Sequence, residues 1–194
     1  MRKRGPWTIH EMRTAFENPW MQVVEHVVTQ PDGTPGNYGV VSFRNLAIGV
    51  LPLDAEGNVL LVGQHRFPND YYSWELPEGG GARDVAPVES AKRELREETG
   101  AAAENWREFL RMDMSNSITD EIAIGFLAWG LSSGKAEPDP TEVLETRRAP
   151  FREVLEMCLS GEIRDSLTIA MVTTAQIKAA RGDFPDDVAA LILR

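Results

Sequence analysis

A glycine-rich stretch that leads into a short acidic helix constrains this chain more than any other feature. Residues 75–81 read Glu-Leu-Pro-Glu-Gly-Gly-Gly, and residues 93–100 read Arg-Glu-Leu-Arg-Glu-Glu-Thr-Gly. Pro87 lies between them and suits the first turn of a helix, because the amide hydrogen that proline lacks has no helical partner there. Gly100 suits the left-handed position that ends a helix. We therefore predict a glycine-rich turn followed by a helix from about Ala86 to Thr99.

Three glutamates lie on one narrow strip of this helix. At about 100° per residue, Glu94 and Glu98 lie one turn apart, and Glu97 lies at the edge of the same strip. Such pairs repel by roughly 0.2–0.5 kcal/mol even when exposed, and Arg93 can offset part of this. A bound Mg²⁺ would offset more, since it prefers hard oxygen ligands and is commonly held by carboxylates together with substrate phosphate. From the charges alone, a solvated and charge-rich helix face is the alternative.

The residues from Gly79 to Ala101 resemble the Nudix box, the signature of a family that hydrolyses nucleoside diphosphates linked to another moiety. Gly79 matches the opening glycine, and the closing pattern Arg-Glu-apolar-x-Glu-Glu-x-Gly-apolar begins at Arg93. Val85 departs from the pattern, because the family has there a glutamate that commonly supports the box arginine. The resemblance implies an α/β (α+β) protein with the Nudix fold, in which a mixed β-sheet is sandwiched between helices.

The resemblance also implies a metal site and a catalytic set. Glu94, Glu97 and Glu98 would hold Mg²⁺, with Mn²⁺ as a substitute. The residue before the first box glycine is Glu78, which would bind the metal through its main-chain carbonyl or its side chain, with no contribution as the alternative. The catalytic residues would be Arg93, Glu97 and a glutamate after the loop at residues 132–141.

That loop glutamate would act as the general base or complete the metal site. Glu142 is the best positional match to it, and Glu145 is the reserve. A solvated loop acid is the alternative for both.

Three further residues are candidates for substrate binding. Family members that act on nucleotide sugars often carry Gln-aromatic-Arg where this chain has Gln64-His65-Arg66. Arg66 would therefore reach a substrate phosphate or ribose, with a surface ion pair as the alternative, and His65 would be structural. Trp74 ends an aromatic stretch that suits a wall for a base or sugar, although core packing is the alternative. The segment from Ser115 to Glu121 resembles a loop of ADP-ribose diphosphatases, in which Glu121 would contact the substrate or a metal, with a surface acid as the alternative. The departures of this segment at positions 116 and 117 leave other nucleotide sugars open.

Residues 1–45 are predicted to be a separate β-segment, and residues 46–194 the Nudix domain with C-terminal helices. Strands at 20–28 and 38–43 flank a turn at 31–36 rich in proline and glycine, and residues 8–16 are a third strand or an arm. In nucleotide-sugar members of the family, a similar segment forms a homodimer and reaches the partner's active site. An extra sheet layer within one chain is the alternative.

The other predicted elements follow from hydrophobic pattern and breakers. The nearly continuous apolar run at 46–53 is typical of a strand that is buried on both faces. Further strands are expected at 59–62, 104–114, 122–131 and 146–149, helices at 150–160 and 165–180, and a tail at 184–193 that docks on the domain.

Composition narrows the classes of partner and compartment. The net charge of −10 argues against a nucleic-acid footprint, which needs clustered lysine and arginine. No apolar run approaches the roughly 20 residues of a membrane span, and no apolar segment follows the basic N-terminus as in a secretory signal. Cys158 is the single cysteine, so no disulfide can form within the chain and a cytoplasmic location is expected.

Together these features predict a Mg²⁺-dependent hydrolase of a nucleoside diphosphate sugar such as ADP-ribose. Two alternatives share the same box: a Nudix hydrolase of nucleoside triphosphates or dinucleoside polyphosphates, and a non-catalytic Nudix-fold regulator that senses a nucleotide. Residues 64–66 and the N-terminal segment disfavour the first alternative. Retention of Glu94, Glu97 and Glu98 disfavours the second.

Overall fold

The computed structural model describes residues 1–136 and 143–194, which form two compact units. The first unit comprises Met1–Leu46 and Asp113–Ile122, and the second comprises Ala47–Met112 and Ala123–Arg194. The sequence analysis assigned residues 113–122 to the second domain. They group with the first because the Val41 amide donates to the Ile118 carbonyl at 2.9 Å, while the Asp120 amide donates to the Val41 carbonyl at 3.2 Å.

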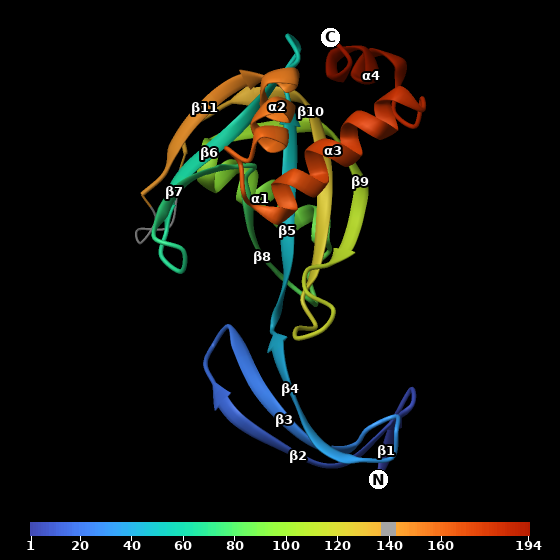
Figure 1. Ribbon diagram of the computed structural model, residues 1–194. Coiled ribbons are helices and arrows are strands. Elements are labelled where there is room, and N and C mark those ends of the chain that lie inside the picture. Colours follow the sequence, from blue (N-terminus) through green and yellow to red (C-terminus); the bar gives the residue numbers. More distant parts are fainter. Residues whose placement is uncertain (137–142) are drawn as a thin grey trace. The chain divides into compact units, whose positions relative to one another are not determined.

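The first unit is an antiparallel four-stranded sheet whose strands follow chain order (Figure 1). Its strands are β1 (Arg2–Arg4), β2 (Trp7–Glu17), β3 (Met21–Thr29) and β4 (Pro35–Phe43). The predicted hairpin is confirmed as β3 and β4, and the third strand as β2; β1 was not predicted. Asp32 shapes the turn between β3 and β4 by accepting a hydrogen bond from the Thr34 amide at 2.9 Å.

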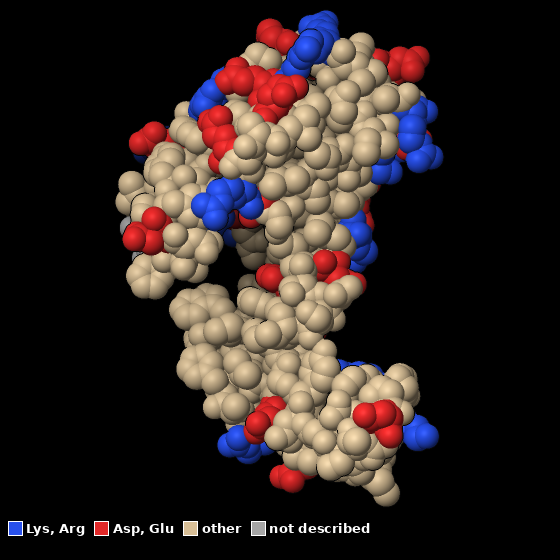
Figure 2. Space-filling view, viewed as in Figure 1, with Lys and Arg blue, Asp and Glu red and all other residues tan. Residues whose placement is uncertain are grey.

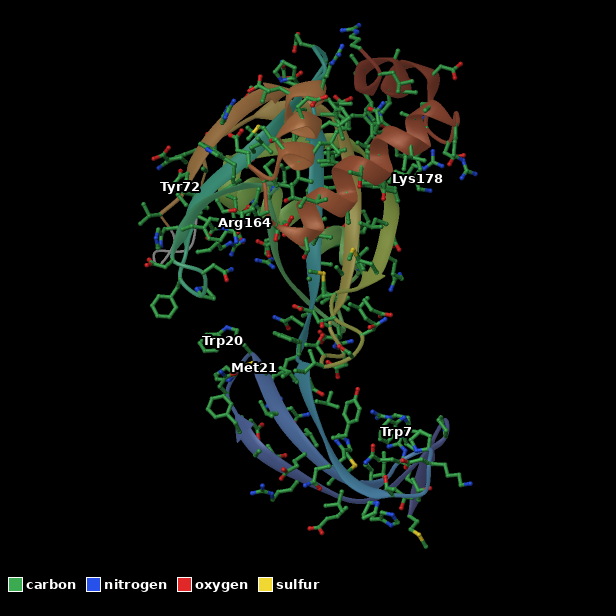
Figure 3. The ribbon with its side chains drawn as sticks, viewed as in Figure 1. Trp7, Trp20, Met21, Tyr72, Arg164 and Lys178 are labelled. Carbon is green, nitrogen blue, oxygen red and sulfur yellow. The ribbon has the colours of Figure 1, made fainter. Side chains whose placement is uncertain are left out.

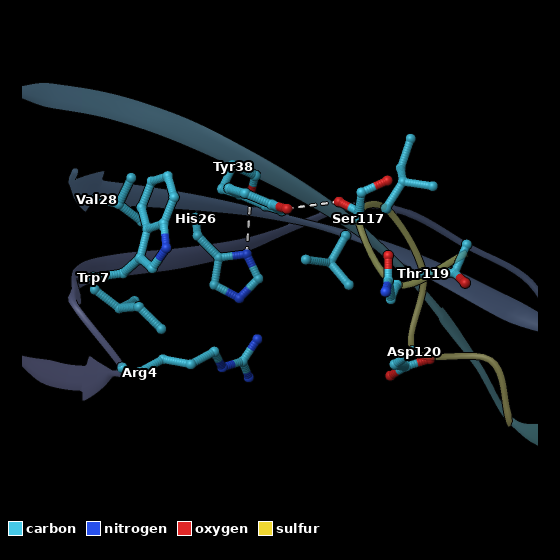
Figure 4. Close-up of a pocket in the computed structure, with 13 residues that line it drawn as sticks. Arg4, Trp7, His26, Val28, Tyr38, Ser117, Thr119 and Asp120 are labelled. Carbon is cyan, nitrogen blue, oxygen red and sulfur yellow. Dashed lines mark hydrogen bonds between the residues drawn. The ribbon is translucent and has the colours of Figure 1, made fainter. Parts of the chain in front are cut away.

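A cavity of about 410 Å³ is lined by this sheet and by residues 116–120 of the same unit (Figure 4). The rings of Trp7 and Tyr38 pack edge to face with centroids 5.3 Å apart. The buried His26 donates from Nδ1 to the Tyr38 carbonyl at 3.1 Å, and the Tyr38 hydroxyl donates to the Ser117 carbonyl at 2.6 Å. These bonds hold the loop and the sheet of the first unit together.

The second unit is built on a mixed seven-stranded sheet. Its main order is β11-β6-β5-β10-β9, with β7 paired to β6 and β8 paired to β5. The strands are β5 (Asn45–Leu53), β6 (Asn58–Arg66), β7 (Tyr71–Glu75), β8 (Glu78–Ala82), β9 (Ala101–Asp113), β10 (Ile122–Ser133) and β11 (Glu145–Pro150). β5 pairs with β10 in parallel, whereas β6 pairs with β7 and β11 in antiparallel fashion.

Helices cover both faces of this sheet (Figure 1). They are α1 (Pro87–Thr99), α2 (Phe151–Ser160), α3 (Ser166–Ala180) and α4 (Asp186–Ile192). Successive β5 residues face opposite helices, since a Cβ on Gly49 would meet Met171 of α3 at 2.6 Å, whereas the Ile48 side chain lies beside Gly81, next to Ser90 of α1. The predicted sheet between helices is therefore confirmed.

The glycine-rich stretch before α1 differs from the prediction. We expected a turn, but residues 78–82 form strand β8, which pairs with β5, and residues 71–75 form β7 on the edge of β6. Glycine weakens a strand in isolation. Here it allows close approach on both sides, because a Cβ on Gly81 would meet the Ile48 side chain at 2.7 Å.

Helices α2 and α3 begin and end close to the predicted positions, and the predicted tail forms the short helix α4. Asp165 caps α3 by accepting a hydrogen bond from the Thr168 amide at 2.7 Å, the usual role of aspartate at this position. Val188 and Ile192 of α4 are buried, so the tail docks as expected. Within the described residues, no helix combines the length and the apolar character needed to cross a membrane.

Candidate active site

Helix α1 places two of its glutamates inside the second unit. Glu94 and Glu98 are only 7% and 5% exposed, and Leu95 on the same helix is fully buried in the core. Glu97 at the edge of the strip keeps about a third of its side chain exposed. The strip is therefore not a solvated helix face, and its buried charges need compensation.

Gly79 of β8 makes room for the first of these carboxylates. A Cβ built at Gly79 would overlap all three atoms of the Glu94 carboxylate. The Glu94 carboxylate can therefore take this position only because Gly79 has no side chain.

Arg93 joins the strip to the glycine-rich strand. Its guanidinium donates to Glu94 Oε1 at 2.6 Å, to Glu97 Oε2 at 2.8 Å and to the Gly80 carbonyl at 2.8 Å. Burial alone would lower the pKa of Arg93, but the charges of Glu94 and Glu97 outweigh it and hold that pKa above its usual value. Val85, in the place of the family's supporting glutamate, is 44% exposed. Arg93 is held without that glutamate.

Glu78 connects the second buried carboxylate to helix α3. The Glu78 amide donates to Glu98 Oε2 at 3.2 Å, while its side chain turns to Thr168, whose hydroxyl donates to Glu78 Oε1 at 2.9 Å. Burial, followed by the charge of Asp165, raises the pKa of the Glu78 carboxyl well above its usual value. Glu78 therefore lies at the site by its main chain, while its carboxyl group is bonded to helix α3.

The donor chemistry of this strip fits a divalent cation, although the side chains as placed do not surround one. In the part of the chain that the structure describes, no group of three or more histidine, cysteine, aspartate or glutamate side chains converges to hold a metal. Arg93 instead bridges Glu94 and Glu97. Buried carboxylate oxygens beside a glycine backbone are the hard ligands that Mg²⁺ takes, so Glu94, Glu97, Glu98 and the main chain of Glu78 remain the predicted ligands.

Arg66 lies at the end of β6 and is held by a residue that the sequence analysis missed. Its Nε is 3.0 Å from both carboxylate oxygens of Glu75, which is 2% exposed. These bonds raise the pKa of Arg66, and the charges of Glu78 and Asp165 act in the same direction. The guanidinium thus keeps a fixed orientation and a permanent charge. The neighbouring His65 is exposed, with Nε2 3.4 Å from Asp70.

The other predicted residues lie in different surroundings. Trp74 packs edge to face on Tyr72 with ring centroids 5.7 Å apart, and the Arg147 guanidinium lies over the Trp74 ring, 5.9 Å from its centroid. Glu121 belongs to the first unit, where burial and the charge of Asp120 raise its pKa. Glu145 begins β11, and burial together with the charge of Glu145 raises the pKa of Tyr72.

Glu142 lies outside the described residues, so the predicted general base stays a prediction. The described residues around the strip include two further polar residues that the sequence analysis did not name, Thr168 and Asp165. Asp165 could have been identified as a helix cap, but the contact between Thr168 and residue 76 spans 92 positions.

The surface of the second unit mixes charges of both signs. Figure 2 shows acidic and basic side chains interspersed on the visible face rather than one continuous basic surface.

Arg164, between α2 and α3 (Figure 3), lies 4.6 Å from the ring centroid of Tyr71 on β7.

Replacing Gly79 by alanine should disrupt this site. We expect Gly79→Ala to displace the Glu94 carboxylate and to weaken Mn²⁺ binding at least tenfold by calorimetry, because the new methyl group needs the same space. Gly39→Ala is the matched control, since a Cβ there meets no atom within 4 Å. Unchanged Mn²⁺ affinity in Gly79→Ala would show that Glu94 is not a ligand.

Comparison with known proteins places this geometry in a family. A model described as the NUDIX domain matches residues 43–168, and one described as the nucleoside diphosphate sugar hydrolase N-terminal domain matches residues 7–41. A crystal structure of an ADP compounds hydrolase superposes with a TM-score of 0.82 at 17% identity, covering 95% of this chain and 100% of that one. This similarity shows a shared fold.

Sequence relatives agree with the family models. An ADP-ribose pyrophosphatase of Mycobacterium tuberculosis is 36% identical over 131 residues, which is 65% of this chain and 62%, less than two thirds, of that relative. An ADP-ribose pyrophosphatase of Bacillus subtilis is 31% identical over 155 residues, covering 79% of this chain and 83% of the relative. A GDP-mannose pyrophosphatase of Yersinia enterocolitica is 32% identical over 131 residues, covering 62% of this chain and 68% of the relative. With the box residues gathered on α1 and β8, these matches show that the chain belongs to the Nudix hydrolase family.

Proposed function

We propose that this protein hydrolyses the diphosphate bond of a nucleoside diphosphate sugar such as ADP-ribose, in a Mg²⁺-dependent reaction that yields a nucleoside monophosphate and a sugar phosphate. The observation that carries the proposal is the buried pair Glu94 and Glu98 beside the glycine backbone of β8. Relatives named as ADP-ribose and GDP-mannose pyrophosphatases support a nucleotide sugar as the substrate class.

Cleavage of a P–O–P linkage needs charge neutralisation on the phosphoryl oxygens and an oriented water. Bound Mg²⁺ would supply neutralisation and make a bound water more acidic. Glu94, Glu97 and Glu98 would hold the cation, and Arg93 would keep Glu94 and Glu97 in place. Glu142 would accept the proton of the attacking water, with Glu145 as the reserve.

Direct attack by water is favoured over a covalent enzyme intermediate. The single thiol, Cys158, is buried on α2, and burial together with the charge of Asp165 raises its pKa to about 11. A thiol of this kind is a poor nucleophile at neutral pH, since the thiolate is the reactive form.

Arg66 is proposed to bind the distal phosphate of the substrate. A guanidinium that is fixed by Glu75 loses little freedom on binding an anion, and its planar fork suits phosphate oxygens. In this proposal Arg66 and the cation together overcome the repulsion that a chain of net charge −10 exerts on a diphosphate. Trp74 and Glu121 are proposed to contact the base or sugar.

The first unit is proposed to be a dimerisation arm. Its match to the N-terminal domain of nucleoside diphosphate sugar hydrolases supports this role, as do large exposed apolar side chains on β2 and β3 and between them, at Met12, Phe16, Trp20 and Val27. Trp20, labelled in Figure 3, is 70% exposed. We further propose a cytoplasmic location and no nucleic-acid or membrane partner, in keeping with one unpaired cysteine and the acidic composition.

A panel of nucleotides tests the substrate class. We expect the purified protein with Mg²⁺ to release AMP from ADP-ribose, or a nucleoside monophosphate from another nucleotide sugar, faster than it hydrolyses nucleoside triphosphates or dinucleoside polyphosphates. Product chromatography distinguishes these cases. No turnover of any nucleotide sugar would contradict the proposal, and binding without turnover would favour a nucleotide-sensing regulator.

Removal of one buried charge tests the metal strip. Glu98→Gln should lower kcat by at least about 100-fold, because it removes an ionised ligand, while the melting temperature stays similar or rises since a buried charge is lost. Glu89→Gln on the same helix is the matched control, because Glu89 is exposed and pairs only with Lys92 among its described ion-pair partners. Full activity in Glu98→Gln would remove this residue from the site.

Oligomeric state tests the arm. Sedimentation at micromolar concentration should give the mass of a homodimer, because aromatic and methionine side chains such as those exposed on the first unit are enriched in protein interfaces. Trp20→Ser should shift the equilibrium toward monomer, whereas Leu159→Ser, an exposed apolar position on α2, should not. If the unsubstituted protein sediments as a monomer, the first unit is not a dimerisation arm.

A further inference from the structure

We propose that Thr168 of α3 is a positioning residue for the metal site: its hydroxyl fixes the Leu76–Glu78 segment so that the Glu78 main chain stays against Glu98. The inference rests on the proposed function for its meaning, but its geometry is that of the second unit alone. Thr168 lies outside the Nudix box and contacts no predicted substrate group.

The Thr168 hydroxyl both accepts and donates a hydrogen bond within the Leu76–Glu78 segment. It accepts from the Leu76 amide at 3.0 Å and donates to Glu78 Oε1 at 2.9 Å. Because a hydroxyl carries a single hydrogen, the first bond leaves that hydrogen for the second. The oxygen therefore clamps residue 76 by its main chain and residue 78 by its side chain.

The contacts of Thr168 with Leu76 and Glu78 affect the glutamate strip of α1 through one amide, that of Glu78. Between Leu76 and Glu78 the chain passes through Pro77, whose carbonyl accepts from the Val50 amide of β5 at 2.9 Å. At Glu78 the amide donates to Glu98 Oε2 at 3.2 Å. A shift of this segment would move the Glu78 amide and carbonyl together, because they belong to neighbouring peptide groups of one residue.

Helix α3 is a firm support for this clamp. Thr168 is fully buried, and its amide donates to the capping carboxylate of Asp165 at 2.7 Å. Three polar groups of the α3 start and the turn thus form a connected set, which is the arrangement by which outer residues orient metal ligands.

Substitution at Thr168 separates positioning from folding. Thr168→Val keeps the shape of the side chain and removes the hydroxyl, and Thr168→Ser keeps the hydroxyl and removes the methyl group. Thr173→Val is the matched control on the same helix, because the Thr173 hydroxyl bonds only to its own helix backbone, at Ile169 and Ala170, among the described residues. If Thr168→Val does not fold, Thr168→Ala replaces it, since it introduces no new bulk.

Three readouts are compared in these variants. The first is the Mn²⁺ dissociation constant of the metal-free protein by calorimetry, the second is kcat and KM for the best nucleotide sugar, and the third is amide exchange of the peptide that contains Leu76. We expect Thr168→Val to weaken Mn²⁺ binding and lower kcat about 10- to 100-fold, as outer-shell changes do, with KM within threefold and faster exchange at Leu76. Thr168→Ser should restore affinity and kcat to within threefold, and Thr173→Val should match the unsubstituted protein in all three.

Folded Thr168→Val, or its alanine replacement, with Mn²⁺ affinity and kcat within twofold of the unsubstituted protein would overturn the inference. A serine variant as impaired as the valine variant would also overturn it, because the methyl group rather than the hydroxyl would then matter. An unsubstituted protein that binds Mn²⁺ but turns over no nucleotide sugar would refute the proposed function alone, since the affinity comparison still decides the role of Thr168. An unsubstituted protein that binds no Mn²⁺ would refute both.

Discussion

Carboxylates that are more than nine-tenths buried and one helical turn apart repel each other and lose their hydration, so the rest of the site has to compensate Glu94 and Glu98. An unpaired buried charge costs several kcal/mol, which is comparable with the stability of a whole domain. In this protein Arg93 and the Glu78 amide compensate these charges with hydrogen bonds. Gly79 leaves the space that the Glu94 carboxylate occupies. The same contacts that form the site therefore also stabilise helix α1 in its buried position.

The departure at Val85 shows that Arg93 can keep its position without the glutamate that the family pattern places there. The family pattern has a glutamate there that supports the box arginine, whereas this chain exposes a valine to solvent. Arg93 nevertheless makes hydrogen bonds to two carboxylates and one carbonyl. A guanidinium has five N–H donors in a planar fork, so it can lose one partner and remain oriented by the others.

The sheet and helix α3 hold the segment that faces α1. Pro77 is tied to β5, and Leu76 and Glu78 are tied to Thr168 of α3. The carboxyl of Glu78, with its raised pKa, is bonded to Thr168 rather than grouped with the carboxylates of the strip. The predicted contribution of Glu78 to metal binding is thereby limited to its main chain, and helix α3 acquires a connection to the site that local sequence does not reveal.

By itself the sequence determined the elements whose causes are local. Pro87 and Gly100 predicted the bounds of α1, helical periodicity placed three glutamates on one strip, and the apolar run at 46–53 predicted the central strand. Tertiary structure decided the features that depend on contacts between distant segments. It turned residues 78–82 into a strand, since only pairing with β5 offsets the weakness of three glycines, and it selected Glu75 and Thr168 as partners of Arg66 and Glu78. Spacing along a chain specifies which side chains share one helix face, whereas a hydrogen bond across 92 positions exists only after the layers have packed.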